Sequence, residues 1–384
     1  MSLMKKNQQL LFSKTVTALF VLCVLTVSCR KTDLSSVSSS SSSNEESISF
    51  EGYKQVNLVA NNSSFGAQRV DPRLQNAWGI SVSDGGTIWL SANETGLSFV
   101  YDSTGAHVLP PVTIPSHTAG KRGNPTGTIF NSTTDFIVPG SAAPARFIFV
   151  DEGGTISAWN SVNLAAAIKV ADHSKSGAVY KGLAMAHNNG NNFLYVTNFS
   201  KARIDVFDKD FKPVSGMPFR DPDLPKGYAP FNIKNIGGML FVTYALQTAD
   251  KEDDSAGAGH GFVDIFKPNG EMVKRFASRG KLNSPWGITK GKHGFLNDNG
   301  NDDSNDDGND DDDILIGNFG DGRINVFDHN GKFLGQLMNN GNPIVIDGLW
   351  AIENKIFGIS SKQLYFSAGP NNEEDGLFGY LIKK

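Results

Sequence analysis

The sequence predicts an all-β protein, specifically a six-bladed β-propeller, and three observations support this prediction. A unit of short strands recurs along the chain after residue 50. Six copies follow one another, and helical periodicity is nearly absent. The 41 glycines of the 384-residue chain supply the positive-φ corners that short strands need. Six units with room for four strands each favour a propeller over a solenoid.

Each unit contains a β-branched strand that ends in Asn or Asp, followed by a strand that ends in Val-Phe-Asp. The clearest copies are VTNFSKARIDVFD (196–208) and IGNFGDGRINVFD (316–328), in which Ile204 and Ile324 alternate with polar neighbours. The first strands begin at NAWGI (76–80), NPTGT (124–128), YKGLA (180–184), APFNI (229–233), SPWGI (284–288) and IDGLW (346–350). Their anchors, which lie 48 to 61 residues apart, are Gly79, Gly127, Gly182, Asn232, Gly287 and Gly348.

The last unit lacks an obvious fourth strand before Lys384. Residues 53–60, YKQVNLVA, form an alternating strand that belongs to none of the six units. We therefore expect residues 53–60 to complete the sixth blade, because this closure removes the exposed sheet edges that promote aggregation. The propeller is predicted to span residues 51–384.

Residues 1–28 are predicted to be a lipoprotein signal peptide. Lys5 and Lys6 precede an apolar run, 16–27, that is short for a membrane-spanning helix. The run ends in Ser28-Cys29, which resembles a bacterial lipobox, although its usual leucine lies one position early. We expect lipidation of Cys29 and anchoring in the cell envelope, at the outer membrane; a simple secreted protein and a membrane-anchored N-terminus are the alternatives.

Residues 29–50 follow as a serine-rich tether, which has nothing apolar to bury and should hold the propeller away from a surface. The membrane contact is expected through the N-terminal lipid only. The net charge of −4 gives no support for a nucleic-acid partner. Both cysteines, Cys23 and Cys29, precede the propeller, so it contains no disulfide or cysteine nucleophile. We expect a monomer.

The chain resembles a family of uncharacterised, secreted, bacterial single-domain propellers, which are similar to NHL-repeat proteins. The stretches that resemble it include DPRLQNAWGI (71–80), GAVYKGLAM (177–185), DPDLPKGYAPFNI (221–233), LNSPWGI (282–288), IGNFGDGRINVFD (316–328) and IDGLWAI (346–352). The resemblance implies the propeller fold and an extracytoplasmic location, and it implies no activity. The acidic insertion 297–313 departs from the family pattern.

Strand starts and second-strand ends should meet at one axial mouth of the propeller. The candidate ligand-binding residues there are Asn76, Asn93, Asn124, Asp151, Asn198, Asn232, Asn318 and Asp347. Trp78, Trp286 and Trp350 lie beside the strand starts and are expected to provide apolar walls. The alternative is that the Asn and Asp side chains cap turns and the tryptophans fill the core.

The acidic insertion 297–313 contains the start of a calcium-binding loop. Asp303, Asn305 and Asp307, followed by Gly308, have the spacing of oxygen ligands around Ca²⁺, and Asp311 is a further candidate ligand. The closing Glu is missing, so a solvated acidic loop is the alternative. A second polar insertion, 247–261, interrupts the fourth unit and is a candidate rim of the axial mouth.

No GxSxG, HExxH or GxGxxG motif occurs in the sequence. We therefore expect a propeller that binds a small molecule, a glycan or a protein and has no chemistry of its own. The alternative is a metal-assisted hydrolase or lyase of the NHL-like type, with Asp151 and Asp347 around Ca²⁺. A structural role in the cell envelope is a third hypothesis.

Overall fold

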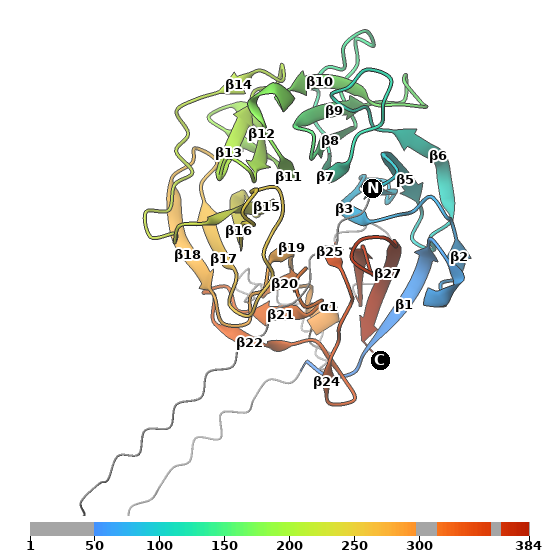
Figure 1. The fold of residues 1–384 in the computed structure, drawn as a ribbon, viewed down its shortest axis with the longest axis vertical. Helices are drawn as coiled ribbons and strands as arrows, with labels where there is room; N and C mark the ends of the chain where they lie inside the picture. The colour runs from blue at the N-terminus through green and yellow to red at the C-terminus, as the bar shows by residue number, and fades with distance from the viewer. Residues whose placement is uncertain (1–49, 297–312, 355–361, 384) are drawn as a thin grey trace, which may run out of the picture. The chain divides into compact units, whose positions relative to one another are not determined.

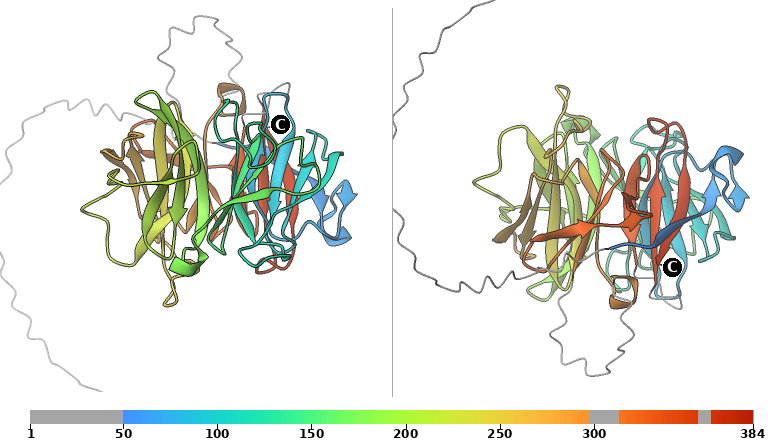
Figure 2. Two further views of the ribbon diagram at one scale, coloured as in Figure 1. Left: turned by 90° about the horizontal axis from the view of Figure 1, so that it is seen from above. Right: turned by 90° about the horizontal axis from the view of Figure 1, so that it is seen from below.

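The computed structural model describes residues 50–296, 313–354 and 362–383, and within them six antiparallel sheets are arranged in a ring (Figure 1). In the side views, the strands of each blade run between the two faces of the ring (Figure 2). This arrangement confirms the six-bladed β-propeller that the repeat predicted.

Each of the first three blades has four strands, ordered from the innermost strand outward. Blade one contains β3 (Ala77–Val82), β4 (Ile88–Ala92), β5 (Leu97–Tyr101) and β6 (His107–Thr113). Blade two contains β7 (Pro125–Phe130), β8 (Phe147–Asp151), β9 (Thr155–Trp159) and β10 (Ile168–Asp172). Blade three contains β11 (Tyr180–Asn188), β12 (Asn191–Asn198), β13 (Arg203–Phe207) and β14 (Pro213–Val214).

The last three blades follow the same order. Blade four contains β15 (Tyr228–Ile236), β16 (Met239–Leu246), β17 (Phe262–Phe266) and β18 (Met272–Ser278). Blade five contains β19 (Pro285–Lys290), β20 (Ile314–Asn318), β21 (Ile324–Phe327) and β22 (Phe333–Gln336). Blade six contains β25 (Leu349–Glu353), β26 (Gln363–Ala368), β27 (Leu377–Lys383), β1 (Tyr53–Ala60) and β2 (Arg69–Val70). The remaining elements are η1 (Ser63–Phe65), η2 (Ser174–Ser176), α1 (His293–Leu296), β23 (Met338–Asn339) and β24 (Asn342–Pro343).

The N-terminal strand closes the ring, as predicted. Strand β1 pairs antiparallel with β27, from Tyr53 opposite Lys383 to Ala60 opposite Leu377. The first ordered strand therefore completes the last blade. Both ends of the described chain are therefore held in the same sheet, and the pairing with β1 covers the edge that β27 would otherwise expose.

The innermost strands β3, β7, β11, β15, β19 and β25 lie close to one another around the axis. A Cβ atom at Gly79 would lie 2.4 Å from the carbonyl oxygen of Thr126 in the next strand, and one at Gly287 would lie 2.8 Å from that of Trp350. Glycine at the position of Gly79 and Gly287 therefore allows neighbouring innermost strands to approach each other closely, and we call this the close-approach position. The register of every innermost strand shifts around the same position, as at a β-bulge.

This alignment confirms the anchor Asn232, corrects its expected place at a strand start, and corrects the anchor Gly348. Asn232 lies in the middle of β15, at the position that glycine occupies in four of the other innermost strands, and not at a strand start. In blade six the equivalent residue is Ala351, not Gly348, because Trp350-Ala351-Ile352 aligns with Trp286-Gly287-Ile288. The glycine motif was thus a good guide to the period and an incomplete guide to the register.

Buried hydroxyls link neighbouring blades at the bulges. The Ser367 Oγ accepts a hydrogen bond from the Ala351 amide, 3.1 Å away, and donates to the carbonyl of Trp78, which joins blade six to blade one. In the same way, the Thr197 Oγ1 accepts from the Gly182 amide at 2.6 Å and donates to the carbonyl of Phe231 at 3.2 Å. These bonds satisfy backbone groups that the bulges remove from the ladders.

The hydrophobic core lies between the blades. Trp89 of blade one, for example, stacks on Phe147 of blade two with ring centroids 4.1 Å apart, and its ring is 4.6 Å from that of Trp159. Such sheet-to-sheet contacts bury both faces of the inner strands, which explains why β4, β5, β8 and β9 are buried along their whole length. Among the described residues, no helix is both long enough and apolar enough to cross a membrane.

Candidate functional site

An aromatic layer divides the axial channel into two ends. The layer consists of Trp78, Phe231, Trp286 and Trp350, which precede the close-approach position in their strands, together with Phe319. Trp350 stacks on Trp78 with ring centroids 3.6 Å apart and on Phe319 with centroids 3.9 Å apart. We call the end where the innermost strands begin the strand-start end, and the end where they finish the cavity end.

The cavity end contains a cavity of about 790 Å³, within the range of small-molecule sites. All six innermost strands line it. The lining contains both apolar and polar residues: Val82, Ile129 and Met185 are partly exposed apolar residues, and Ser81, Thr128, Asn232 and Lys234 are polar ones. Ile80, Leu183, Ile233, Ile288 and Ile352 also belong to the lining strands, but their side chains are at most 5% exposed and pack in the hydrophobic core. Each innermost strand is paired on one side only, so its other backbone edge faces the axis (Figure 1). The cavity therefore combines apolar walls with backbone donors and acceptors.

Charged side chains lie at the rim of the cavity in a polar arrangement. Lys234 of β15 and Lys292, which follows β19, come from blades four and five; Glu353 of β25 and Asp84, which follows β3, come from blades six and one. The Lys234 Nζ lies 2.5 Å from the Glu353 Oε2, and the Glu353 side chain is only 7% exposed. The lysines thus come from two neighbouring blades and the carboxylates from the next two, and Lys234 and Glu353 form an ion pair across blade five.

Trp286 contributes to the cavity wall, and its indole Nε1 is buried without an acceptor among the residues that the structure describes. A buried N–H donor without a partner costs free energy, commonly about 1–3 kcal/mol. Asn232, which also lines the cavity, donates from its Nδ2 to the Trp286 carbonyl at 2.7 Å. The inner part of the cavity thus carries polar groups as well as aliphatic walls.

The strand-start end is filled by a buried lysine and its carboxylates. The Lys181 Nζ, in β11, lies 2.5 Å from the Glu152 Oε1, 3.2 Å from the Asp253 Oδ1 and 4.9 Å from the ring centroid of Trp78. Lys181 is 1% exposed. Burial opposes its charge, but Glu152 and Asp253 raise the pKa of the Lys181 ammonium above its ordinary value, so it is protonated.

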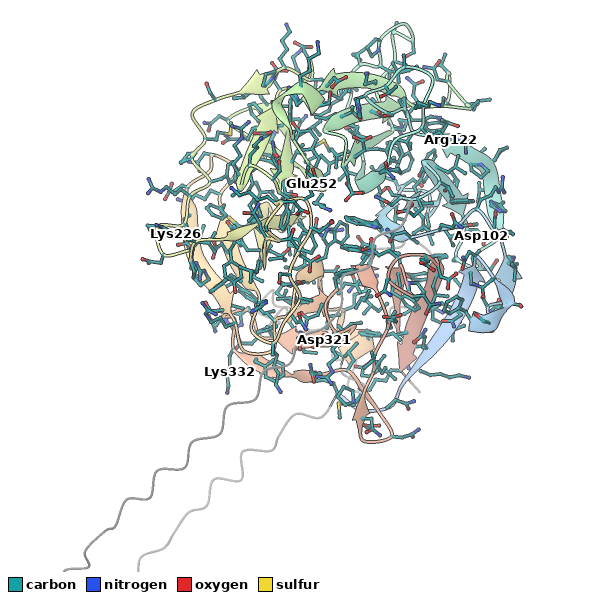
Figure 3. All side chains as sticks on the ribbon, in the orientation of Figure 1. Asp102, Arg122, Lys226, Glu252, Asp321 and Lys332 are labelled. Atoms are coloured by element: carbon teal, nitrogen blue, oxygen red, sulfur yellow. The ribbon has the colours of Figure 1, made fainter. Side chains whose placement is uncertain are left out.

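Asp253 belongs to the insertion 247–261 between β16 and β17. Figure 3 shows Glu252 of this insertion near the middle of the ring in a view along the axis. The ion pair between Asp253 and Lys181 therefore holds the insertion at the strand-start end, where a rim was expected from the sequence.

Glu373 adds a carboxyl to the same end. Three consecutive residues, Asn371, Asn372 and Glu373, have φ of 57°, 54° and 70°, a left-handed turn that is strained for residues other than glycine. The Asn76 Nδ2 donates to the Glu373 Oε2 at 2.6 Å. Burial, together with repulsion from Glu152, raises the pKa of Glu373 to about 7 even though the Asn76 hydrogen bond acts in the opposite direction.

Four of the predicted ligand-binding residues gather at the strand-start end. Asn76 is buried, has a φ of 46°, and accepts a hydrogen bond from the Trp350 Nε1 at 2.9 Å. The Asn93 Nδ2 donates to the Glu152 Oε2 at 2.9 Å, and the Asn124 Nδ2 donates to the Asn93 carbonyl at 3.2 Å. Burial raises the pKa of Asp151 to about 6, although two hydrogen bonds from Thr155 lower it.

The other four predicted residues do not join this group. Asn198 and Asn318 are buried at the ends of β12 and β20: the Asn198 Nδ2 donates to Asp205 at 2.7 Å, and the Asn318 Nδ2 donates to the Lys281 carbonyl at 2.8 Å. Asp347 is exposed and accepts from the Asn371 amide at 2.9 Å. Asn232 lines the cavity at the other end of the channel, contrary to its expected place among the strand starts. Ligand binding by these eight residues stays a prediction.

The predicted calcium ligands Asp303, Asn305, Asp307 and Asp311, and the lipidation site Cys29, lie outside the described residues. Within the described ranges, no three His, Cys, Asp or Glu side chains lie in an arrangement that could hold a metal ion. Calcium binding and the metal-assisted enzyme both stay predictions.

Sequence reasoning missed Lys181, Glu152, Lys234 and Glu353. A signal for Lys181 was present, because it occupies the position before the close-approach glycine, where three other innermost strands carry Trp. At the position two residues after the close-approach residue, Lys234 and Glu353 are the charged residues among the six innermost strands. Comparing the six repeats at every aligned position, and not only at their anchors, would have identified Lys181, Lys234 and Glu353 as candidates.

The fold and the two ends of the channel define a six-bladed β-propeller with an axial cavity. Solved structures of similar fold include a streptogramin B lyase, 13% identical with a TM-score of 0.50 over 86% of this chain and 97% of that one. Another is a structural-genomics protein of unknown function from Bacteroides thetaiotaomicron, 12% identical with a TM-score of 0.50 over 87% of this chain and 74% of that one. At these identities, the likeness shows the fold alone.

Sequence relatives place the chain in a family. Uncharacterized protein R648 of Acanthamoeba polyphaga mimivirus is 32% identical over 342 residues, which cover 86% of this chain and 80% of the relative. Uncharacterized protein L690 of the same virus is 33% identical over 344 residues, 86% of each chain. The protein belongs to the family of these mimivirus proteins. No protein-family model matches it. Because both relatives are viral, they do not support the secreted bacterial origin that the resemblance to secreted propellers implied.

Proposed function

We propose that the propeller is a binding module that holds a small, largely apolar molecule in the axial cavity. The cavity of about 790 Å³ at the cavity end carries this proposal. At the strand-start end, by contrast, Lys181 and its carboxylates occupy the space above the aromatic layer. A rigid closed ring with a preformed cavity is well suited to recognition, since little conformational entropy is lost on binding.

The walls indicate what kind of molecule fits. Val82, Ile129 and Met185 are partly exposed apolar residues of the lining, and burying apolar ligand surface against them is favourable by about 25 cal/mol per Å². The free backbone edges and the polar lining residues supply hydrogen-bonding groups for a few polar atoms. These features support a compact ligand with an apolar body and few polar groups.

The test uses N-phenyl-1-naphthylamine, an uncharged apolar dye whose fluorescence rises in apolar surroundings. We expect saturable binding at one site in the wild type and its loss in Met185→Trp, which puts a larger ring into the cavity wall. Met239→Trp, the same substitution at an exposed residue that does not line the cavity, is the matched control. Equal dye binding by Met185→Trp and the wild type would contradict the proposal, provided that circular dichroism shows both to be folded.

We also propose that the propeller is anchored to the outer membrane through a lipid on Cys29. Support comes from the sequence only: the apolar run 16–27, the Ser28-Cys29 pair and the serine tether beyond it. In a bacterial host, radiolabelled palmitate should enter the wild type and not Cys29→Ala, which should appear in the soluble fraction. Equal labelling of the two forms would contradict the anchor.

A further inference from the structure

The innermost strands differ in polarity between the two halves of the ring. The third residue after the close-approach position is Val82, Phe130 or Met185 in blades one to three, and Asn235, Lys290 or Asn354 in blades four to six. Val82, Phe130 and Met185 are half-buried and line the cavity together with Ile129. Because β3, β7 and β11 lie across the axis from β15, β19 and β25, these apolar side chains occupy one side of the cavity (Figure 1).

The side of the cavity formed by blades four to six presents polar groups. Its apolar lining residues are at most 6% exposed, and they are Ile233, Trp286, Ile288, Ala351 and Ile352. The more exposed lining side chains of these blades are Lys234, Asn235 and Lys292. A molecule in the cavity therefore meets apolar surface on one side and polar groups on the other.

Lys234 has hydrogen-bond donors for a ligand. Among the described residues, the Glu353 Oε2 accepts from the Lys234 ammonium at 2.5 Å, and the Lys234 side chain is 33% exposed. Because an ammonium group has three N–H donors, Lys234 can keep Glu353 and also donate to a ligand oxygen. The neighbouring Asn235 is less suited, since its Nδ2 donates to the Met185 carbonyl at 2.9 Å and its Oδ1 accepts from the Gly238 amide at 3.0 Å.

The formal charges of the cavity lining favour an uncharged ligand. The charged lining residues are two lysines, Lys234 and Lys292, and two acids, Asp84 and Glu353, so their formal charges cancel. An ionic ligand would lose its hydration on entry and would add one charge without a counterion. An uncharged oxygen acceptor avoids both costs.

We infer that the ligand of the cavity is an uncharged amphipathic molecule, whose apolar side packs on blades one to three and whose carbonyl oxygen accepts a hydrogen bond from Lys234. A carbonyl oxygen only accepts, which suits an ammonium, whereas a hydroxyl group would also need an acceptor for its own hydrogen. This inference rests on the proposed binding function of the cavity and adds the chemical class of the ligand.

The test compares three naphthalenes of similar size by their displacement of N-phenyl-1-naphthylamine. The probes are 2-ethylnaphthalene, which has no oxygen, 2-acetylnaphthalene, which has a carbonyl group, and 2-naphthoate, which is an anion. The quantity measured is the ratio of the affinity for the ketone to that for the hydrocarbon. Comparing this ratio between variants cancels the difference in hydrophobicity between the two probes.

A double variant assigns the ratio to Lys234. In Lys234→Met/Glu353→Gln, which removes the lysine and leaves no buried carboxylate in its place, we expect the ratio to fall at least about tenfold, because a hydrogen bond from a charged donor is lost. The matched control is Lys267→Met/Glu271→Gln, which changes an exposed pair of blade four outside the cavity and should keep the ratio of the wild type. An unchanged ratio in the folded Lys234 variant overturns the inference.

Two measurements on the wild type need no variant. The infrared carbonyl band of bound 2-acetylnaphthalene should lie at lower wavenumber than in hexane, because a hydrogen bond weakens the C=O bond. A band at the hexane position overturns the inference. We also expect 2-naphthoate to bind at least about tenfold more weakly than the ketone, and equal or tighter binding would show that the ligand class is anionic.

Failure of the inference differs from failure of the proposed function. If the dye and 2-ethylnaphthalene bind in the cavity while Lys234 has no effect on the ratio, the ligand class is wrong and the binding function stands. If neither the dye nor any of the three naphthalenes binds, the binding function itself is wrong.

Discussion

The two ends of the axial channel are built from the same six strands, yet one is filled and the other is hollow. At the strand-start end, Lys181 and Glu373 fill the space above the aromatic layer with buried charge. At the cavity end, aliphatic side chains of moderate size leave about 790 Å³ open. The backbone of the blades is the same at both ends. The comparison therefore teaches that the size and charge of the side chains on the innermost strands decide which end of the channel has room for a ligand.

The ends also differ in how they use charge. Lys181 is enclosed by protein carboxylates and needs no further partner. At the cavity end, the Lys234–Glu353 pair belongs to the lining of the cavity, and its lysine side chain is 33% exposed. We therefore interpret the strand-start charges as structural, and the following predictions test how far the fold depends on that end of the channel, on the aromatic layer and on the links between blades.

The aromatic layer that separates the ends should be the most sensitive part. Trp350→Ala removes the stacking of the indole on Trp78 and Phe319 and leaves the Asn76 Oδ1 without the hydrogen bond from the Trp350 Nε1. We expect a loss of about 3–5 kcal/mol in the free energy of unfolding, measured by urea denaturation. Phe333→Ala, at a 36% exposed ring, is the control and should cost much less. A loss below about 1 kcal/mol for Trp350→Ala would mean that the aromatic layer does not stabilise the propeller.

The ion pairs of Lys181 at the strand-start end should make the second-largest contribution to the free energy of unfolding. Lys181→Met leaves Glu152 near other carboxylates without its buried cation, at a cost of about 3 kcal/mol. Lys267→Met removes an exposed lysine from a comparable pair and should change stability by less than about 1 kcal/mol. If the two variants unfold at the same urea concentration, Lys181 is not the cation that holds this end together.

The blade links provide a smaller effect. Ser367→Ala leaves the Ala351 amide and the Trp78 carbonyl without the hydroxyl that joins blade six to blade one, and should cost about 1–3 kcal/mol. Ser176→Ala, at an exposed hydroxyl, is the control. Equal thermal midpoints for the two variants would show that the ring does not depend on this link.

The pH dependence of stability should show the smallest effect. The folded-state pKa of Glu373 is about 7, above the ordinary value of 4.5, so the folded protein binds more protons between these values than the unfolded chain. The Glu373 contribution is fully present below pH 4.5 and is lost as the pH rises through 7. Because the carboxyl is partly exposed, we expect this loss to be about 1–2 kcal/mol.

Glu373→Gln should remove that part of the pH dependence. The measurement is the difference in unfolding free energy between the wild type and Glu373→Gln at about pH 5 and about pH 8, on either side of the folded-state pKa. Subtraction cancels the contributions of other buried acids, such as Asp264, whose pKa burial raises to about 7. A difference that does not change with pH would show that Glu373 titrates normally.

Much of the fold could be predicted from the sequence because the repeat is a local pattern. In the strands that contain Ile204 and Ile324 and end before the Asp of Val-Phe-Asp, apolar and polar residues alternate over four or five positions, so the strand can be identified from a short stretch of sequence. The closure by residues 53–60 followed from counting strands in the last unit, and the pairing of β1 with β27 confirms it. These inferences needed no knowledge of which residues meet across the axis.

The site depends on contacts that the anchors alone do not give. Lys181 meets Asp253 because the insertion 247–261 reaches the axis, and Lys234 meets Glu353 across an intervening blade. The cavity exists because six innermost strands, far apart in the sequence, carry side chains that leave room at the same height. Asn232 was misplaced for a related reason: it was grouped with Asn76 and Asn124 at the strand starts, although its anchor position lies in the middle of the innermost strand.

The most direct test of the account is a crystal structure of the protein grown with N-phenyl-1-naphthylamine. We predict electron density for the dye between the aromatic layer and the rim, in contact with Val82, Ile129 and Met185. The Lys181–Glu152 and Lys181–Asp253 contacts should be unchanged. Dye bound at the strand-start end, with Asp253 displaced from Lys181, would contradict the assignment of the cavity end as the binding end.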